Sequence, residues 1–254
     1  MKRSIIFAYG IICYAIGMGS LFYGLGWLGN FGVPRTIDSA PETGLGFALL
    51  VNLGVLALFV VQHSVMARPA FKRWWTRFVP PAAERSTYVL FSGIAMALMM
   101  LLWQPMGGTV WTVDSPTGRA VLWGLYGLGW TILVTSTFML NHFDLFGLRQ
   151  VWLELRGREY TALEFKVPIF YNVVRHPIYV GWITLMWATP TMTAAHLVFA
   201  LSSTVYILVA IRLEERDLVA EHGSDYTSYR DRVPALVPFS GGSRRTADDA
   251  RQAA

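Results

Sequence analysis

The stretch Pro177–Ile211, with the sequence PIYVGWITLMWATPTMTAAHLVFALSSTVYILVAI, decides the fold of this chain because it contains no Asp, Glu, Lys or Arg. Pro190 divides it into a short segment, Ile178–Ala188, and a longer one, Ala194–Ile211. Proline interrupts a helix because it lacks a backbone N–H. The short segment cannot cross a hydrocarbon core alone, since crossing takes about 20 residues. The stretch therefore predicts a helical hairpin bent at Pro190 and packed against protein rather than bare lipid.

Four further stretches upstream also lack charged residues, and each is long enough for one membrane-crossing helix. Backbone amides in lipid must bond within their own segment, so each crossing segment is expected to be a helix. We predict an all-α integral membrane protein with four transmembrane helices, the bent hairpin and short cytoplasmic helices. A single domain is expected over 1–239, followed by a flexible tail over 240–254. The spans are expected at about 5–28, 45–66, 86–106 and 120–141, with the hairpin at 177–211.

The composition supports a membrane protein and excludes several other classes. Of the 254 residues, 54% are apolar and only 15% are charged, against roughly 25% charged in soluble domains. The same composition excludes a disordered chain, and the single cysteine excludes a disulfide-stapled one. The net charge of +5 does not indicate a nucleic-acid partner, because the basic residues flank the apolar runs, as topology signals and contacts to lipid headgroups do.

Lys and Arg residues collect in alternate loops, and this bias sets the expected orientation. Between the first two spans Arg35 is the only base, and the turn at 104–118 has none. The bases at the amino terminus, after the second span and after the fourth all fall on one side if the hairpin returns to the side where it began. We therefore expect an inner-membrane protein in the lipid bilayer with both termini cytoplasmic. Segments 142–176 and 212–239 would form a cytoplasmic cap over the bundle.

Three polar clusters follow the apolar segments on that side. They are Asn141–Asp144 with the segment that follows, Tyr171–Trp182 at the start of the hairpin, and Arg212–Arg216 with the tail after it. Polar groups at the end of an apolar bundle are costly unless they are paired or used. Because the two ends of a hairpin lie side by side, we expect the Arg175–His176 pair to neighbour the Glu214–Glu215 pair.

These residues carry a resemblance to a known family. An Arg-His-Pro-x-Tyr-x-Gly run at 175–181 is followed by the hairpin, the two glutamates and a Gly-x-x-Tyr-x-x-Tyr-x-x-x-Val-Pro run at 223–234. This order resembles the isoprenylcysteine carboxyl methyltransferase superfamily, which includes phospholipid N-methyltransferases. The upstream half is similar to the bacterial methanethiol S-methyltransferases and the neighbouring NnrU-like membrane proteins. The segments that carry this second likeness are Gln62–Pro69, Phe71–Trp75, Glu84–Tyr88 and Asn141–Gly147.

The resemblance implies S-adenosyl-L-methionine as methyl donor, S-adenosyl-L-homocysteine as product, and no metal. The carboxylate of the donor needs charge-assisted hydrogen-bond donors, which Arg175, His176 and Gln150 can supply. Its ribose diol needs acceptors, which Glu214 or Glu215 can supply, and aromatic rings can contact its sulfonium. The resemblance places His176, Tyr179, Tyr171 and Glu214 around the donor. The full set of expected cofactor-binding residues is Gln150, Tyr171, His176, Pro177, Tyr179, Gly181, Glu214 and Glu215.

A thiol acceptor must lose its proton, because the thiolate is the nucleophile and a free thiol is mostly protonated near neutrality. We expect His142 to act as the base and Asp144 to orient it, with Arg149 or Arg175 supplying a positive field. His63 and Trp182 are candidates to line the substrate site.

The expected function is methylation of a small thiol, methanethiol to dimethyl sulfide, at a cytoplasm-facing site. The choice of a thiol as the methyl acceptor rests on the family likeness alone. One alternative keeps the chemistry but takes a prenylcysteine carboxylate or a phospholipid amine as acceptor. The other is a membrane protein without catalysis, either of the NnrU-like kind or a transporter.

Overall fold

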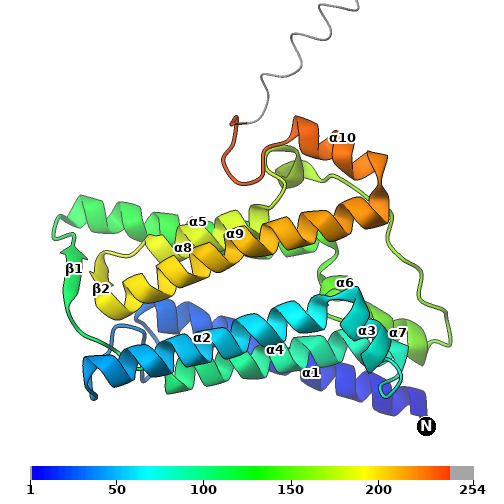
Figure 1. Cartoon of the computed structure of the whole chain (residues 1–254), viewed down its shortest axis with the longest axis horizontal. Coiled ribbons are helices and arrows are strands. Elements are labelled where there is room, and N and C mark those ends of the chain that lie inside the picture. The colour runs from blue at the N-terminus through cyan, green and yellow to red at the C-terminus, as the bar shows by residue number, and fades with distance from the viewer. Residues whose placement is uncertain (1, 241–254) are drawn as a thin grey trace, which may run out of the picture.

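The computed structural model describes residues 2–240, and the chain there is mostly helical (Figure 1). Five helices are long and apolar enough to cross a membrane. These are α1 (Lys2–Gly29), α2 (Leu45–Ala67), α4 (Pro81–Leu102), α5 (Pro116–Leu140) and α9 (Ala194–His222). The shorter elements are α3 (Pro69–Trp75), β1 (Thr109–Thr112), α6 (His142–Leu145), α7 (Leu148–Leu155), the 3₁₀ helix η1 (Ile169–Asn172), α8 (Pro177–Trp187), β2 (Thr191–Thr193) and α10 (Ser224–Arg232).

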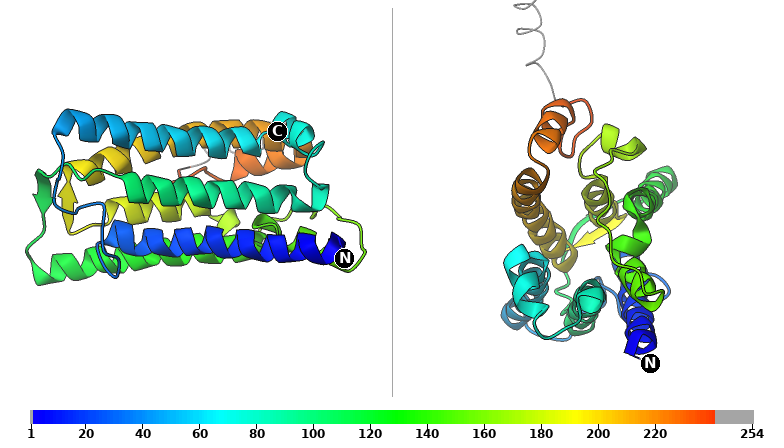
Figure 2. Two further views of the ribbon diagram at one scale, coloured as in Figure 1. Left: turned by 90° about the horizontal axis from the view of Figure 1, so that it is seen from below. Right: turned by 90° about the vertical axis from the view of Figure 1, so that its right-hand side faces the viewer.

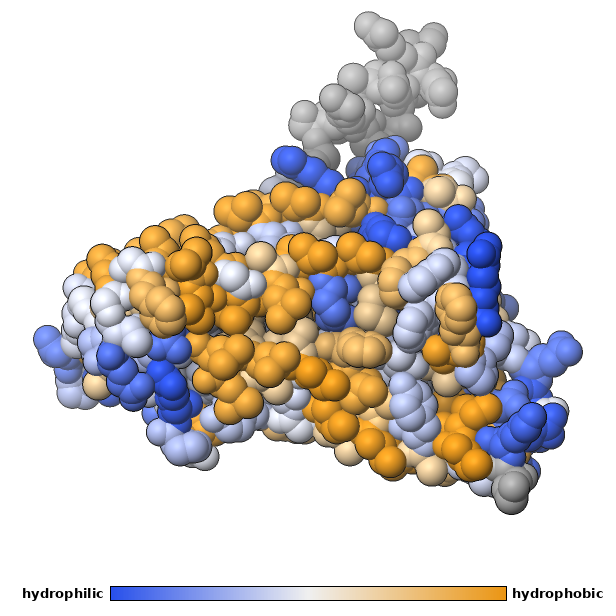
Figure 3. Space-filling model, turned by 60° about the horizontal axis from the view of Figure 1, so that its bottom comes forward, coloured by the Kyte–Doolittle hydropathy of each residue, from blue (hydrophilic) through white to orange (hydrophobic). Residues whose placement is uncertain are grey.

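The long helices form two layers that run along a common axis (Figure 1). One layer contains α1, α2 and α4, and the other contains α5, α8 and α9, as the end-on view in Figure 2 also shows. We call the end that carries β1 and β2 the sheet end, and the end that carries α3, α6, α7 and α10 the cap end. The face in Figure 3 is apolar along the middle of the bundle and hydrophilic toward its ends, as expected of a membrane protein.

The hairpin expected at 177–211 is present. Helix α8 ends at Trp187, Pro190 lies in the connection, and α9 begins at Ala194 (Figure 1). The side chain of Thr193 accepts a hydrogen bond from the backbone N–H of His196 and so caps α9. The expected end at Ile211 is wrong, however, because α9 continues to His222. Its continuation is rich in Arg, Leu, Glu and Ala, which favour helix.

Two short strands qualify the prediction of an all-α protein. Strand β1 pairs antiparallel with β2 at the sheet end, with Trp111 opposite Met192. The carbonyl of Pro190 extends this pairing by accepting a hydrogen bond of 2.8 Å from the backbone N–H of Val113. Thr, Val and Trp favour extended backbone, but a run of four such residues is too short to separate from a loop by sequence pattern.

Three of the four expected upstream spans agree closely with the structure, and the third is shifted. Helix α4 covers 81–102 instead of 86–106. It begins at Pro81, because proline fits the first position of a helix. It ends at Leu102. Gln104 precedes Pro105, and a residue that precedes a proline avoids the helical conformation, so the helix cannot continue far beyond Leu102.

His196 lies at the sheet end, away from the predicted site. Its side chain connects the hairpin to the loop between α1 and α2. Its side chain is 1% exposed. Nδ1 lies 3.1 Å from Oδ2 of Asp38, and Nε2 lies 3.0 Å from the carbonyl oxygen of Met186. These contacts give His196 a structural role.

Helices α5 and α8 approach closely where Gly129 faces Gly181. A Cβ atom at Gly181 would lie 2.7 Å from the carbonyl oxygen of Gly129 and 2.8 Å from the backbone nitrogen of Leu133. Gly181 was predicted to bind cofactor. The structure gives this glycine a packing role, because only hydrogen fits at the helix crossing.

We expect Gly181→Ala to lower the Tm of the detergent-solubilised protein, because overpacking of this kind costs about 1–3 kcal/mol. Gly127→Ala on α5 is the matched control, since a Cβ there would have no atom within 4 Å. Thermal unfolding of both variants checks the prediction, and equal Tm values would contradict the packing role.

Candidate active site

The two ends of the hairpin meet at the cap end, as the sequence predicts. Nε and Nη2 of Arg175 lie 2.8 and 2.7 Å from Oε1 of Glu215. Nε2 of His176 lies 3.0 Å from the same oxygen. His176 precedes α8, whose first residue is the buried Pro177. A buried imidazole and a guanidinium thus converge on one carboxylate.

Glu214 has different surroundings from Glu215. Its Oε2 accepts a hydrogen bond of 2.9 Å from the hydroxyl of Tyr179, and Nδ1 of His176 lies 4.0 Å away. The side chain of Glu214 is 44% exposed, whereas that of Glu215 is 15% exposed. Burial, and then the negative charge of Glu214, raise the pKa of Tyr171 in η1. Glu215 is therefore enclosed by its partners, and Glu214 keeps an accessible carboxylate edge.

The C-terminal segment holds this group in place. The backbone N–H groups of Arg175 and His176 donate to the carbonyls of Pro234 and Ala235 at 2.8 and 3.1 Å. Nη1 of Arg175 donates to the carbonyl of Arg230 at 2.9 Å and also to that of Val233. In addition, the buried Tyr229 of α10 donates to the carbonyl of Tyr171 at 2.7 Å. The guanidinium predicted to activate a thiol is thus engaged with Glu215 and this segment.

The pair of His142 and Asp144, expected as base and orienter, does not form within residues 2–240. Nδ1 of His142 lies 2.8 Å from Oγ1 of Thr137, and Nε2 lies 2.9 Å from the hydroxyl of Tyr14. Asp144 instead bonds Arg149, whose Nη1 lies 2.8 Å from Oδ1. The reason is local, because the turn of α6 directs these two side chains to different partners. Burial lowers the pKa of His142.

Asp144 and Gln150 line a cavity of about 830 Å³ at the cap end. Nε2 of Gln150 donates to the carbonyl of Asp144 at 3.1 Å, and its Oε1 is buried without a protein partner among residues 2–240. Residues of α3, α4, α6 and α7 line this cavity, but Glu214, Glu215, His176 and Tyr179 do not. The predicted site residues therefore form two separate groups.

Polar residues of α2 and α4 form a further group that sequence reasoning mostly missed. The hydroxyl of Tyr88 lies 2.9 Å from Nε2 of His63, and Oγ of Ser92 lies 3.1 Å from Nδ1. Of these residues only His63 was a candidate, because a histidine in an apolar span is conspicuous and a tyrosine is not.

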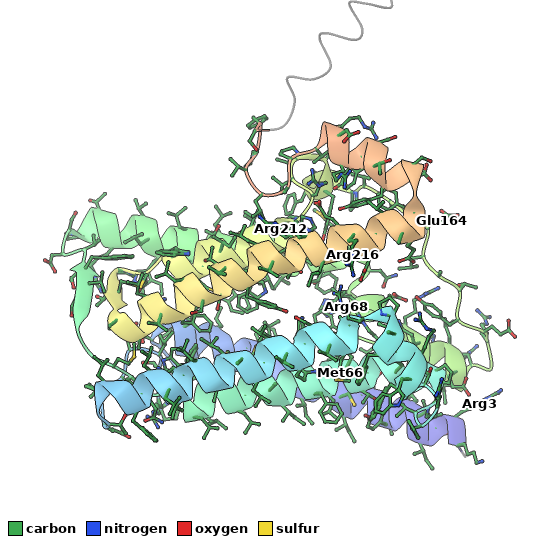
Figure 4. The ribbon with its side chains drawn as sticks, viewed as in Figure 1. Arg3, Met66, Arg68, Glu164, Arg212 and Arg216 are labelled. Carbon is green, nitrogen blue, oxygen red and sulfur yellow. The ribbon has the colours of Figure 1, made fainter. Side chains whose placement is uncertain are left out.

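Two side-chain contacts join α2 to α9 close to this group of polar residues. The hydroxyl of Tyr206 lies 3.1 Å from Oγ of Ser64. Nη1 of Arg68, which lies at the end of α2 below α9 in Figure 4, is 2.8 Å from Oδ2 of Asp217. The remaining substrate candidate, Trp182, packs against Trp130 of α5 with ring centroids 5.9 Å apart. The two contacts between α2 and α9 tie the two layers together next to the polar residues of α2 and α4.

Comparison with known proteins gives the chain several close relatives. It is 52% identical to the methanethiol S-methyltransferase of Crocosphaera subtropica, with 95% of this chain and 94% of the relative covered. It is 51% identical to the methanethiol S-methyltransferase of Mycobacterium tuberculosis, with 94% and 98% covered. Nurim of Bos taurus is 30% identical, with 85% and 86% covered. No family model and no solved structure matches the chain.

Fold, site and relatives together define the class: the protein is a multi-pass membrane methyltransferase. More narrowly, the chain belongs to the methanethiol S-methyltransferase family. The resemblance found in the sequence is therefore confirmed.

Proposed function

We propose that this protein transfers the methyl group of S-adenosyl-L-methionine to methanethiol and releases dimethyl sulfide. The relatives named methanethiol S-methyltransferase support both the reaction and the acceptor. The main structural support for a donor site is that four polar side chains converge where the two ends of the hairpin meet. They are His176, Tyr179, Glu214 and Glu215.

The residues around Glu214 fit the chemistry of the donor. Oε1 of Glu214 has no hydrogen-bond partner in residues 2–240, so it can accept from a ribose hydroxyl. Tyr171 and Tyr179 provide aromatic surface for the adenine or the sulfonium. Glu215 already accepts from Arg175 and His176, so we assign the ribose to Glu214 and a supporting role to Glu215. When bound, the donor supplies an electrophilic methyl group, and the protein positions both partners for in-line transfer.

The donor's carboxylate requires a revision of the expected contacts. Arg175 and His176 are taken by Glu215, and the amide of Gln150 binds a backbone carbonyl. Arg212 and Arg216, labelled in Figure 4, also lie on α9, but each is two residues from Glu214, so their side chains point away from the face of the helix that carries it. The contacts expected for the carboxylate are therefore occupied by protein groups in this structure.

The proposed topology has four crossings followed by the hairpin, with the cap end and both termini in the cytoplasm of an inner membrane. Its support is the charge distribution. The amino-terminal bases, the bases of α3 and those of the 149–175 segment belong to the cap end (Figure 1). Cytoplasmic loops carry the excess of Lys and Arg.

Purified protein given S-adenosyl-L-methionine and methanethiol is expected to release dimethyl sulfide, measured by headspace gas chromatography. A prenylcysteine analogue and a phospholipid amine, run alongside, are expected to remain unmethylated. Glu214→Gln protein serves as the negative control for non-enzymatic transfer. Methylation of the prenylcysteine analogue with no dimethyl sulfide would refute the proposed acceptor.

A further inference from the structure

His63 lies within α2, among apolar residues, yet both its ring nitrogens have polar neighbours. Tyr88 lies 2.9 Å from Nε2, and Ser92 lies 3.1 Å from Nδ1. The ring also stacks on Phe59, with centroids 5.2 Å apart. A polar group in an apolar span is costly and is a functional candidate by default. If Nδ1–H donates to Ser92, Nε2 carries a lone pair that faces the hydroxyl of Tyr88.

A second polar group beside His63 is incompletely bonded. Nε2 of Gln62 donates to Ser92 at 3.4 Å, but Oε1 of Gln62 is buried and has no protein partner in residues 2–240. A buried acceptor without a donor is destabilising, because it has lost its hydrogen bonds to water. A ligand that carries a weak donor, such as a thiol, would relieve part of this cost.

His63 and Tyr88 lie beside the helix that carries Glu214. Oγ of Ser64, the residue after His63, lies 3.1 Å from the hydroxyl of Tyr206 on α9, and Glu214 follows on the same helix, where it accepts a hydrogen bond from Tyr179. The guanidinium carbon of Arg85 lies 5.0 Å from the centre of the Tyr88 ring. Arg85 therefore adds a positive field beside the hydroxyl, and such a field favours a nearby anion.

We propose that Tyr88 and His63 form the proton relay that converts the thiol acceptor into a thiolate, an inference that rests on the proposed function. As the S–H bond breaks, its proton passes to Oη of Tyr88, and the proton of Tyr88 passes to Nε2 of His63. The electron pair stays on the acceptor sulfur. That sulfur then bonds the methyl carbon while the bond from this carbon to the donor's sulfur breaks and leaves its electrons there. His63 later returns the proton to water.

This relay assigns to His63 the role that sequence reasoning gave to His142. Tyr14 and Thr137, the partners of His142, lie on α1 and α5. His63, by contrast, is followed by Ser64, which bonds Tyr206 on the helix that carries Glu214. The charged and titratable groups around the relay are Arg85 on α4 and Glu214, Tyr179 and Tyr206 of the hairpin.

The test compares two thiols in His63→Gln and Tyr88→Phe proteins. With methanethiol, we expect turnover to fall about 100-fold or more, as for loss of a general base. With 2,2,2-trifluoroethanethiol, which ionises at lower pH, the loss should shrink to less than about tenfold, because less proton transfer is needed. Activity of His63→Gln on methanethiol should rise with pH as the thiol ionises in solution. Affinity for S-adenosyl-L-homocysteine, measured by calorimetry, should stay within about twofold of wild type.

Tyr9→Phe is the matched control. It removes a hydroxyl that bonds Thr87, the residue before Tyr88, at 2.9 Å, and we expect its activity on both thiols to be unchanged. Equal losses on the two thiols, or full activity of His63→Gln on methanethiol, would overturn the relay. Wild-type protein that methylates neither thiol would overturn the proposed function itself. If His63→Gln does not fold, as judged by calorimetry, Tyr88→Phe carries the same comparison.

Discussion

Glu214→Gln protein will lose at least about 100-fold in affinity for S-adenosyl-L-homocysteine while it keeps its Tm. Hydrogen bonds to a charged group contribute about 1.5–3 kcal/mol each, and the proposed ribose contact has two hydroxyls to lose. The Tm should be retained because Glu214 is half-exposed and accepts a single hydrogen bond, from Tyr179. Isothermal titration calorimetry and thermal unfolding in detergent measure the two quantities.

Two further variants make this prediction specific. Glu221→Gln removes an exposed carboxylate from the same helix and should change neither affinity nor Tm. Tyr179→Phe removes the group that orients Glu214 and should weaken binding by about tenfold, the equivalent of one hydrogen bond. If Glu214→Gln bound the product as tightly as wild type, the donor would have to lie elsewhere, and the cavity around Asp144 and Gln150 would become the first alternative.

Much of the fold could be predicted from the sequence because the lipid environment limits the possible structures. Charge-free runs longer than about 20 residues can only be helices, and each of the five long helices lies largely within such a run, although α9 extends past its run to His222. Pro190 correctly marked the bend of the hairpin. The short strands β1 and β2 were missed, because their pairing joins residues about 80 positions apart and leaves no periodic signal in either segment.

The candidate site was predictable where chain topology alone brings residues together. A hairpin must place its two ends side by side, so Arg175 and His176 were correctly expected beside Glu214 and Glu215. The choice between the glutamates was not predictable, since it depends on which carboxylate faces the guanidinium. Spacing along the chain failed for His142 and Asp144, because side chains two residues apart in a helical turn point in different directions.

The contact between α2 and the hairpin lay beyond sequence reasoning for a different reason. Ser64 and Tyr206 belong to helices in different layers, and tyrosine is common at both ends of membrane spans. Nothing in either segment shows that these two hydroxyls bond each other. Only the packing of the two layers brings these groups together.

Arg175→Met and Glu215→Leu, made separately, are each expected to lower the Tm in detergent by on the order of 10 °C. Both side chains are largely buried, at 11% and 15% exposed, and removal of one partner leaves the other charge unpaired, which costs about 3–5 kcal/mol. The exposed pair of Arg3 and Glu154, with side chains 60% and 36% exposed, provides the control. Arg3→Met should shift the Tm by no more than about 2 °C, because surface ion pairs contribute little.

The double variant Arg175→Met/Glu215→Leu tests the ion pair separately from the hydrogen bonds that Arg175 donates to the C-terminal segment. Because no unpaired charge remains, the Tm should recover by more than half of the loss seen in either single variant. The attachment of the C-terminal segment should not recover, because it depends on the hydrogen bonds from Arg175 to the carbonyls of Arg230 and Val233. Limited trypsin digestion should therefore cut the double variant after Arg230 and Arg232 faster than wild type. A Tm that stays as low as in the single variants, or unchanged digestion, would show that this guanidinium does not hold the C-terminal segment over the site.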